Sequence, residues 1–98
     1  MNLEQTRSVY FIGIGGIGMS ALARYFVAKG LTVGGYDKTK TDITDALEDL
    51  GILIHFQDDI KHVDSAFLNM ETTLIVYTPA IPQSHSELNY FKSNGFNI

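Results

Sequence analysis

Short apolar runs alternate with amphipathic stretches along this chain. The runs are rich in β-branched and aromatic residues and occupy positions 8–14, 31–37, 52–56 and 72–80, with a last one beginning at 96. Runs that are apolar almost throughout are typical of strands that other elements cover on both faces of a sheet. The pattern therefore predicts four strands and the start of a fifth.

Three amphipathic stretches lie between runs and predict helices. In the first, apolar residues recur at helical spacing from Met19 to Phe26; the second covers residues 41–51, and the third begins at residue 84. All three end at a glycine, at positions 30, 51 and 95, and an apolar run follows each glycine at once.

Two of these helices carry start signals. Thr41 or Asp42 can serve as the N-cap of the second helix. Residues 84–87 read SHSE, which has the spacing of a capping box, and this predicts that Ser84 and Glu87 cap the third helix.

Strands that alternate with helices predict an α/β fold. Such repeated units place parallel strands in one sheet, with helices on both faces and right-handed crossovers. We therefore expect a Rossmann-like, doubly wound parallel sheet of five strands in the order 3-2-1-4-5. Residues 1–98 contain no linker or fixed-period repeat, which predicts a single domain. A last strand with no closing helix after it predicts a fragment of a longer protein.

Four glycines crowd the point where the first strand passes into the first helix. Gly13, Gly15 and Gly18 satisfy the pattern G-x-G-x-x-G, and Gly16 adds a fourth. In this position the pattern favours phosphate or diphosphate binding, because the unpaired N–H groups and the dipole of the helix attract anions. The alternative is that the glycines serve only helix–sheet packing. No Lys-Ser/Thr pair follows, so the turn is not a Walker loop for a γ-phosphate and Mg²⁺.

Each glycine has an expected role. Gly13 permits a tight turn, and Gly18 lets the helix pack close to the sheet. Gly15 and Gly16 let the backbone approach a ligand without a Cβ in between. The residues expected at the diphosphate are Gly13, Ile14, Gly15, Gly16, Ile17, Gly18, Met19 and Ser20.

Two further strand ends belong to the same expected crevice. Asp37 ends the second strand, where a carboxylate can accept a hydrogen bond from a ribose hydroxyl or a base N–H; alternatively it is a turn residue. The sequence YTPAIP leaves the fourth strand beside the first, and its Thr78, Ala80 and Ile81 are expected to line the pocket. The alternative is a proline-stiffened loop that only leads into the third helix.

The composition narrows the classes of function. The net charge is −4 and no Lys/Arg cluster occurs, which argues against a nucleic-acid or anionic membrane partner. The absence of cysteine excludes disulfides and thiolate chemistry. The three histidines lack metal-ligand spacing, so no metal site is expected, and no catalytic residue stands out. A start without a secretory pattern, and no stretch able to span a bilayer, predict a soluble cytoplasmic domain.

The sequence FIGIGGIGMSALA, with GGYD after it and TPAIP late in the chain, resembles the N-terminal domain of the Mur ligases. The glycine turn followed by Met19 and Ser20 is more specific than the general fingerprint, and the similarity covers essentially all 98 residues. It implies a Rossmann-like domain that holds a UDP-sugar. The diphosphate would lie on the glycine turn, and the uridine among Asp37 and residues 78–81.

The resemblance also implies a division of labour in a longer bacterial enzyme. A central domain with a G-T-x-G-K-T loop would hold ATP and Mg²⁺, and a C-terminal domain would help bind an amino acid; this chain contains no G-K-T. The whole enzyme would activate the lactyl carboxylate of UDP-N-acetylmuramate as an acyl phosphate, which the amine of L-alanine attacks to form an amide for peptidoglycan. The chain alone is expected to bind UDP-N-acetylmuramate, to hold no cofactor and to catalyse nothing.

One position departs from the family pattern. Many members carry a histidine just after the third strand, near the nucleotide, where this sequence has Gln57 and Asp58. A carboxylate near a diphosphate is unfavourable unless it is solvated or turned away. Asp58 is therefore not counted among the expected site residues.

Two other classes of protein fit the general glycine pattern. One is the NAD-binding domain of an oxidoreductase, in which Asp37 would hold the adenosine ribose, and the other is a nucleotide-sensing regulatory module. Neither accounts for GIGGIGMS and TPAIP together. Selectivity for uridine ligands over NAD would separate the ligase domain from the oxidoreductase.

Overall fold

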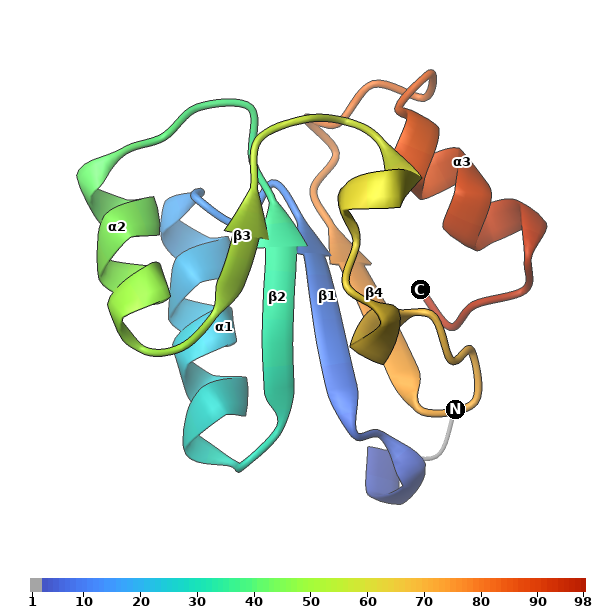
Figure 1. The fold of residues 1–98 in the computed structure, drawn as a ribbon, viewed down its shortest axis with the longest axis horizontal. Helices are drawn as coiled ribbons and strands as arrows, with labels where there is room; N and C mark the ends of the chain where they lie inside the picture. The colour runs from blue at the N-terminus through green and yellow to red at the C-terminus, as the bar shows by residue number, and fades with distance from the viewer. Residues whose placement is uncertain (1–2) are drawn as a thin grey trace.

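The structure, a computed structural model, describes residues 3–98 as one layer of parallel strands between two layers of helices and turns (Figure 1). Its strands and α-helices, in chain order, are β1 (Ser8–Ile12), α1 (Ile17–Ala28), β2 (Thr32–Tyr36), α2 (Asp42–Asp49), β3 (Leu53–His55), β4 (Thr73–Tyr77) and α3 (Ser86–Ser93). Three short 3₁₀ turns complete it: η1 (Leu3–Gln5), η2 (Ile60–His62) and η3 (Ser65–Phe67). Each of the four predicted strands and three predicted helices is therefore present.

The sheet is parallel throughout and has the order β3-β2-β1-β4. This confirms the α/β class and the expected order of the first four strands. The expected fifth strand is not a strand here: Asn97 forms an isolated parallel bridge with Leu74, and Ile75 N–H donates to Asn97 C=O at 2.9 Å. Three residues after Gly95 provide one such bond, and one bond is too few to define a strand.

Two apolar cores lie on the two faces of the sheet, because successive side chains of β1 point to opposite faces. Val9 and Phe11 pack under α1 and α2, whereas Tyr10 and Ile12 pack under α3 and the η2–η3 segment. All five residues of β1 are buried. The expectation of a central strand covered on both faces is therefore confirmed.

Two adjacent glycines in β2 let both cores approach the strand closely. A Cβ on Gly35 would lie 2.6 Å from the Phe11 carbonyl oxygen and 2.9 Å from Cδ1 of Ile14. A Cβ on Gly34 would lie 2.6 Å from the ring of Phe67. These distances are too short for any side chain, so glycine is required at both positions.

The helix starts agree only partly with their expected caps. Thr41 is the N-cap of α2, and its hydroxyl accepts from Thr44 N–H. The expected capping box of α3 is wrong: the N-cap is His85, whose Nδ1 accepts from Leu88 N–H. Glu87 cannot reach back to Ser84, because its side chain is fully buried and hydrogen-bonded elsewhere in the core.

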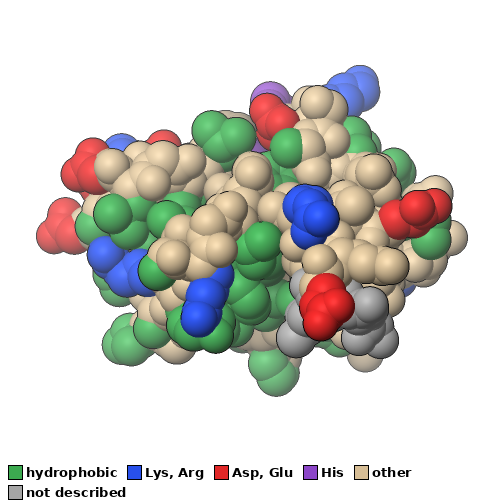
Figure 2. Space-filling model, turned by 90° about the horizontal axis from the view of Figure 1, so that it is seen from below, with side chains coloured by type: hydrophobic (Ala, Val, Ile, Leu, Met, Phe, Trp, Pro, Cys, Tyr) green, Lys and Arg blue, Asp and Glu red, His purple; other side chains and the backbone are tan. Residues whose placement is uncertain are grey.

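Figure 2 shows how the charged side chains are distributed over one face of the domain. On this face, below the amino ends of the strands, Lys and Arg side chains stand singly among uncharged and acidic ones. None of the helices in the described residues is both long enough and apolar enough to cross a membrane. Within residues 3–98, no group of three His, Asp or Glu side chains could hold a metal ion.

Candidate functional site

A cavity of about 590 Å³ opens at the carboxyl ends of β1, β2 and β4. This is the switch point of the sheet, where the connections from β1 and β4 run to opposite faces. The cavity is lined by Gly13, Gly16, Tyr36, Asp37, Lys38, Asp58, Thr78, Ala80, Ile81, Pro82, Ser84 and His85. Six of the twelve expected site residues are among them: Gly13, Gly16, Asp37, Thr78, Ala80 and Ile81.

The glycine turn leads from β1 into α1, and its own N–H groups, from Gly13 to Gly16, all donate to groups of the chain. Gly13 has φ +93°, a conformation that favours glycine, and its N–H donates to Tyr36 C=O at 2.8 Å. Gly16 is the N-cap of α1 and provides no side-chain cap. The first intrahelical bond runs from Ser20 N–H to Gly16 C=O at 2.8 Å, so the N–H groups of residues 17–19 are the open donors of the first turn.

Two of the glycine roles differ from expectation. A Cβ on Gly15 would lie 2.8 Å from Oδ2 of Asp37 and 3.1 Å from Cγ2 of Thr44, so protein atoms already use the space that was expected for a ligand. A Cβ on Gly18 would have nothing within 4 Å. The expected role of Gly18 in close packing is wrong, because the residue is exposed on the side of α1 that faces away from the sheet.

Asp37 ties the end of β2 to the glycine turn. Its Oδ2 accepts from Gly15 N–H at 2.7 Å, and its Oδ1 accepts from Thr39 N–H at 3.0 Å. Each oxygen of an ionised carboxylate can accept more than one hydrogen bond, so both retain capacity for a ligand hydroxyl. The carboxylate is thus held in place by the backbone on two sides at the wall of the cavity.

The loop after β4 forms a compact turn against Gly13. Thr78 Oγ1 accepts from Ala80 N–H at 3.2 Å, and Thr78 C=O accepts from Ile81 N–H at 3.1 Å. Cδ1 of Ile81 would lie only 3.4 Å from a Cβ on Gly13. The two loops therefore lie close together and form one wall of the cavity.

The other expected site residues do not line the cavity. Ile14 is fully buried under α1, and Gly15 N–H is bonded to Asp37. Ile17 is 84% exposed, and the Ser20 hydroxyl donates to its carbonyl oxygen at 2.9 Å. Met19 packs against the core under α1. For the first turn of α1, only backbone N–H groups are placed to meet a ligand.

Six lining residues were not among the expected ones: Tyr36, Lys38, Asp58, Pro82, Ser84 and His85. Lys38 is the one Lys or Arg of the lining, and it follows Asp37 directly, so its position at a strand end was a usable signal. Asp58 and His85 come from the loop after β3 and from the start of α3. Local sequence carried no sign that these two segments meet.

The start of α3 is sealed by these two side chains. Asp58 Oδ2 accepts from Ser86 N–H at 2.8 Å, and its Oδ1 accepts from Glu87 N–H at 2.9 Å. His85 Nδ1 lies 3.3 Å from Leu88 N and 3.2 Å from Asp58 Oδ1. Nδ1 can accept from Leu88 when it is unprotonated, or donate to Asp58 when it is protonated, but not both at once.

His85 leaves one polar atom of the cavity wall without a partner. Its side chain is 5% exposed, and its Nε2 is buried with no hydrogen-bond partner in the described part of the chain. The ring of Tyr36 meets the His85 ring edge-on, with centroids 4.7 Å apart. Burial raises the pKa of the Tyr36 hydroxyl, and the charges of Asp58, Glu87 and Asp37 raise that pKa further.

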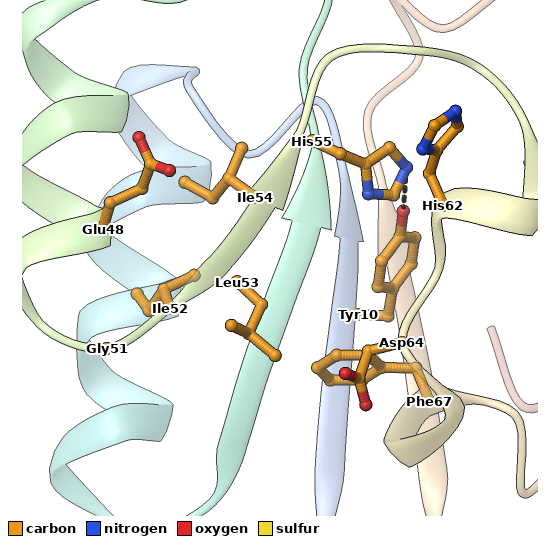
Figure 3. A pocket seen from close by; sticks show the side chains of 10 residues that line it. All are labelled: Tyr10, Glu48, Gly51, Ile52, Leu53, Ile54, His55, His62, Asp64 and Phe67. Carbon is orange, nitrogen blue, oxygen red and sulfur yellow. Dashed lines mark hydrogen bonds between the residues drawn. The ribbon is translucent and has the colours of Figure 1, made fainter.

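A second cavity of about 440 Å³ lies along the outer edge of β3 (Figure 3). Its lining contains none of the expected site residues and no Lys or Arg, but it contains Glu48 and Asp64. In Figure 3 the Tyr10 hydroxyl points toward the His55 ring, and His62 lies beside that ring. Its acidic side chains and its lack of cations make this cavity unsuited to a diphosphate.

Behind this second cavity lies a buried carboxylate network. Glu87 Oε1 accepts from the Tyr10 hydroxyl at 2.5 Å, and Glu87 Oε2 lies 2.6 Å from His55 Nε2. Asp59 N–H also donates to Oε2, at 3.2 Å. Burial and the neighbouring Glu87 charge raise the pKa of Tyr10 strongly. The network joins β1, β3, the loop after β3 and α3.

A parallel sheet with a glycine turn after β1 and a cavity at the switch point defines a doubly wound α/β domain, a class that binds its ligands at this place. Within that class, residues 8–98 match the family described as "Mur ligase family, catalytic domain". The chain belongs to the Mur ligase family, which confirms the resemblance seen in the glycine turn and in TPAIP.

Similar proteins agree with this membership. The chain is 52% identical over 98 residues to a UDP-N-acetylmuramate–L-alanine ligase of Parabacteroides distasonis, and 59% identical over 92 residues to one of Porphyromonas gingivalis. These matches cover 100% and 94% of the chain but only 21% and 20% of the two relatives. The chain therefore spans about a fifth of the length of these curated relatives.

Solved structures show the same fold. The structure of UDP-N-acetylmuramate-alanine ligase MurC from Thermotoga maritima superposes with a TM-score of 0.80 at 30% identity, over 93% of this chain and 20% of that one. A murein peptide ligase from Psychrobacter arcticus gives a TM-score of 0.76 at 26% identity, over 93% of this chain and 18% of that one.

Proposed function

We propose that residues 1–98 form the N-terminal, UDP-sugar-binding domain of a ligase that joins L-alanine to UDP-N-acetylmuramate with ATP hydrolysis. The observation that carries this proposal is the cavity at the switch point, which brings the open first turn of α1 together with Asp37 and the loop after β4. The names of the similar proteins support the choice of substrate.

In this proposal each part of the cavity binds one part of the ligand. The diphosphate lies at the glycine turn within Gly13–Ser20, where residues 17–19 present open backbone N–H groups and the positive end of the α1 dipole. Lys38 adds the one positive side chain of the lining. The uridine lies against Asp37, Thr78, Ala80 and Ile81, where carboxylate, hydroxyl and backbone groups can pair with the ribose and the base.

ATP and Mg²⁺, which the family reaction needs, do not fit the residues of this chain. The glycine turn continues into Met19 and Ser20 rather than into a Lys-Ser/Thr pair. The described residues also contain no cluster of three potential metal ligands. We therefore assign ATP, Mg²⁺ and L-alanine to other domains of a cytoplasmic bacterial enzyme. In that longer chain, the segment that begins at Phe96 would complete the sheet order 3-2-1-4-5 beside β4.

Titration calorimetry of the chain with UDP-N-acetylmuramate, UDP and NAD tests this function. Binding of both uridine ligands, with no binding of NAD, is expected. Binding of NAD without UDP would contradict the proposal and favour the oxidoreductase alternative.

A matched pair of variants places the binding in the cavity. Thr78→Val removes a hydroxyl from the cavity wall and is expected to weaken UDP binding about fivefold, the value of one hydrogen bond. Thr6→Val removes a buried hydroxyl that has no partner among residues 3–98, before β1 at the other end of the sheet, and should leave the affinity unchanged. Equal affinities of the two variants would remove Thr78 from the site.

A further inference from the structure

The N-termini of two helices, α1 and α3, lie at the cavity, and they differ in whether their backbone N–H groups are capped. The N-cap of α1 is Gly16, which has no side chain, so the N–H groups of the first turn stay open. The N-terminus of α3 is closed: Asp58 accepts from Ser86 and Glu87 N–H, and the Leu88 N–H lies against His85 Nδ1. Both Gly16 and Asp58 line the cavity.

The charged side chains that line the cavity also differ between its α1 end and its α3 end. Lys38 is its one Lys or Arg side chain and adjoins the glycine turn. Asp37 is on that side as well, but its two oxygens are bonded to Gly15 and Thr39 N–H. Asp58 stands at the other end, with its side chain 32% exposed and its Oδ1 3.2 Å from His85 Nδ1.

We propose that Asp58 is a specificity-determining residue that excludes phosphate from the N-terminus of α3 and so sets the direction in which a nucleoside diphosphate lies in the cavity. The inference rests on the proposed function, because it assumes that the cavity is the ligand site. Two helix N-termini in one cavity would offer a diphosphate two places. A carboxylate that already occupies the second one repels it by like charge and leaves it no free donors.

The same geometry determines which group of a ligand can bind at the end of the cavity that Asp58 lines. Its carboxylate oxygens have capacity beyond the two backbone N–H groups, and they can only accept. His85, whose Nε2 is buried and has no hydrogen-bond partner among the described residues, also lines the cavity. This end therefore takes an uncharged group that donates hydrogen bonds, such as a ribose hydroxyl or a ring N–H, and the diphosphate is turned toward α1.

Backbone amide shifts in NMR, with inorganic pyrophosphate as the probe, test this arrangement. In the unaltered chain, pyrophosphate should shift the amides of residues 17–20 and leave those of residues 86–88 unchanged. In Asp58→Ala the freed amides of residues 86–88 should shift as well, with pyrophosphate binding tightened about fivefold. Asp58→Asn, which preserves the size of the side chain, should give the same change in smaller degree. Asp59→Asn is the control, because Asp59 caps η2 through Lys61 N–H and does not line the cavity.

The outcomes separate the two proposals. Shifts at residues 86–88 in the unaltered chain, or none there in either Asp58 variant, would overturn the role of Asp58. Shifts there in Asp58→Ala but not in Asp59→Asn would support it. Failure of residues 17–20 to respond to pyrophosphate or UDP in any variant would instead overturn the diphosphate site of the proposed function, while residues 86–88 still report on Asp58.

Discussion

Removal of the Glu87 carboxylate should destabilise this domain more than any surface substitution. Glu87 is fully buried, and its two oxygens are held by the Tyr10 hydroxyl, His55 Nε2 and Asp59 N–H. Glu87→Ala deletes the shared acceptor of all three donors. The Tyr10 hydroxyl suffers most, because Tyr10 is only 1% exposed, water cannot replace the lost bond, and the remaining partner, His55 Nε2 at 3.2 Å, is more distant than Glu87.

The expected loss can be worked from these contacts. The loss of a buried hydrogen bond to a carboxylate costs about 1–3 kcal/mol, and we take about 2 kcal/mol for the Tyr10 hydroxyl, which keeps only its contact to His55 Nε2. His55, whose side chain is 14% exposed, and the Asp59 N–H can recover water, so each loses about 0.5 kcal/mol. The sum predicts that Glu87→Ala lowers the free energy of unfolding by about 3 kcal/mol. Glu87→Gln retains the volume and one acceptor and should lose about half as much.

Urea unfolding followed by circular dichroism measures these losses, with Glu71→Ala as the exposed control. A double-mutant cycle sharpens the test. Tyr10→Phe should cost about 1–2 kcal/mol alone but clearly less in the Glu87→Ala background, where the hydroxyl has already lost its bond to Glu87 and keeps only the longer contact to His55 Nε2. A Glu87→Ala loss equal to that of Glu71→Ala, or additive effects of the two substitutions, would refute the reasoning.

Two more predictions concern packing and pH. Gly35→Ala should lower the free energy of unfolding by about 1–3 kcal/mol, because its Cβ would meet the Phe11 carbonyl oxygen at 2.6 Å. Gly18→Ala has open space around its Cβ and should raise the free energy of unfolding by about 0.5–1 kcal/mol. Urea unfolding of both variants checks this contrast. The pKa values of Tyr10 and Tyr36 are raised above the ordinary value near 10, so their contribution to stability is complete below pH 10 and is lost as the pH rises beyond it. Unfolding measured between pH 9 and 11 should show this fall, and Tyr10→Phe should reduce its slope by an amount that approaches about 1.4 kcal/mol per pH unit near pH 11; an unchanged slope would contradict the burial argument.

The order of the strands was predictable because each apolar run is local and the handedness of the crossovers leaves few arrangements. The cap of α3 was not. The SHSE spacing offered a local capping box, but Asp58 takes the two backbone N–H groups from 28 and 29 positions away. Glu87 is drawn instead to Tyr10, 77 positions away. A tertiary contact therefore overrode a local signal, and no local pattern could have shown it.

The site was predictable to the extent that strand ends define it. Asp37 and Thr78 were found because both directly follow strands that flank the switch point. Gly15 and Gly18 sit in the expected motif, yet the space at Gly15 is used by Asp37, and Gly18 packs against nothing. The motif thus located the turn but did not determine what each glycine contacts. Asp58, set aside because of its charge, proves to line the cavity.

A crystal structure of the chain with bound UDP tests the central claim most directly. We expect electron density in the cavity at the switch point, with phosphate oxygens in hydrogen-bond reach of the N–H groups of residues 17–19 and the uridine between Asp37 and the loop 78–81. Diphosphate density at the N-terminus of α3, or in the cavity along β3, would contradict it.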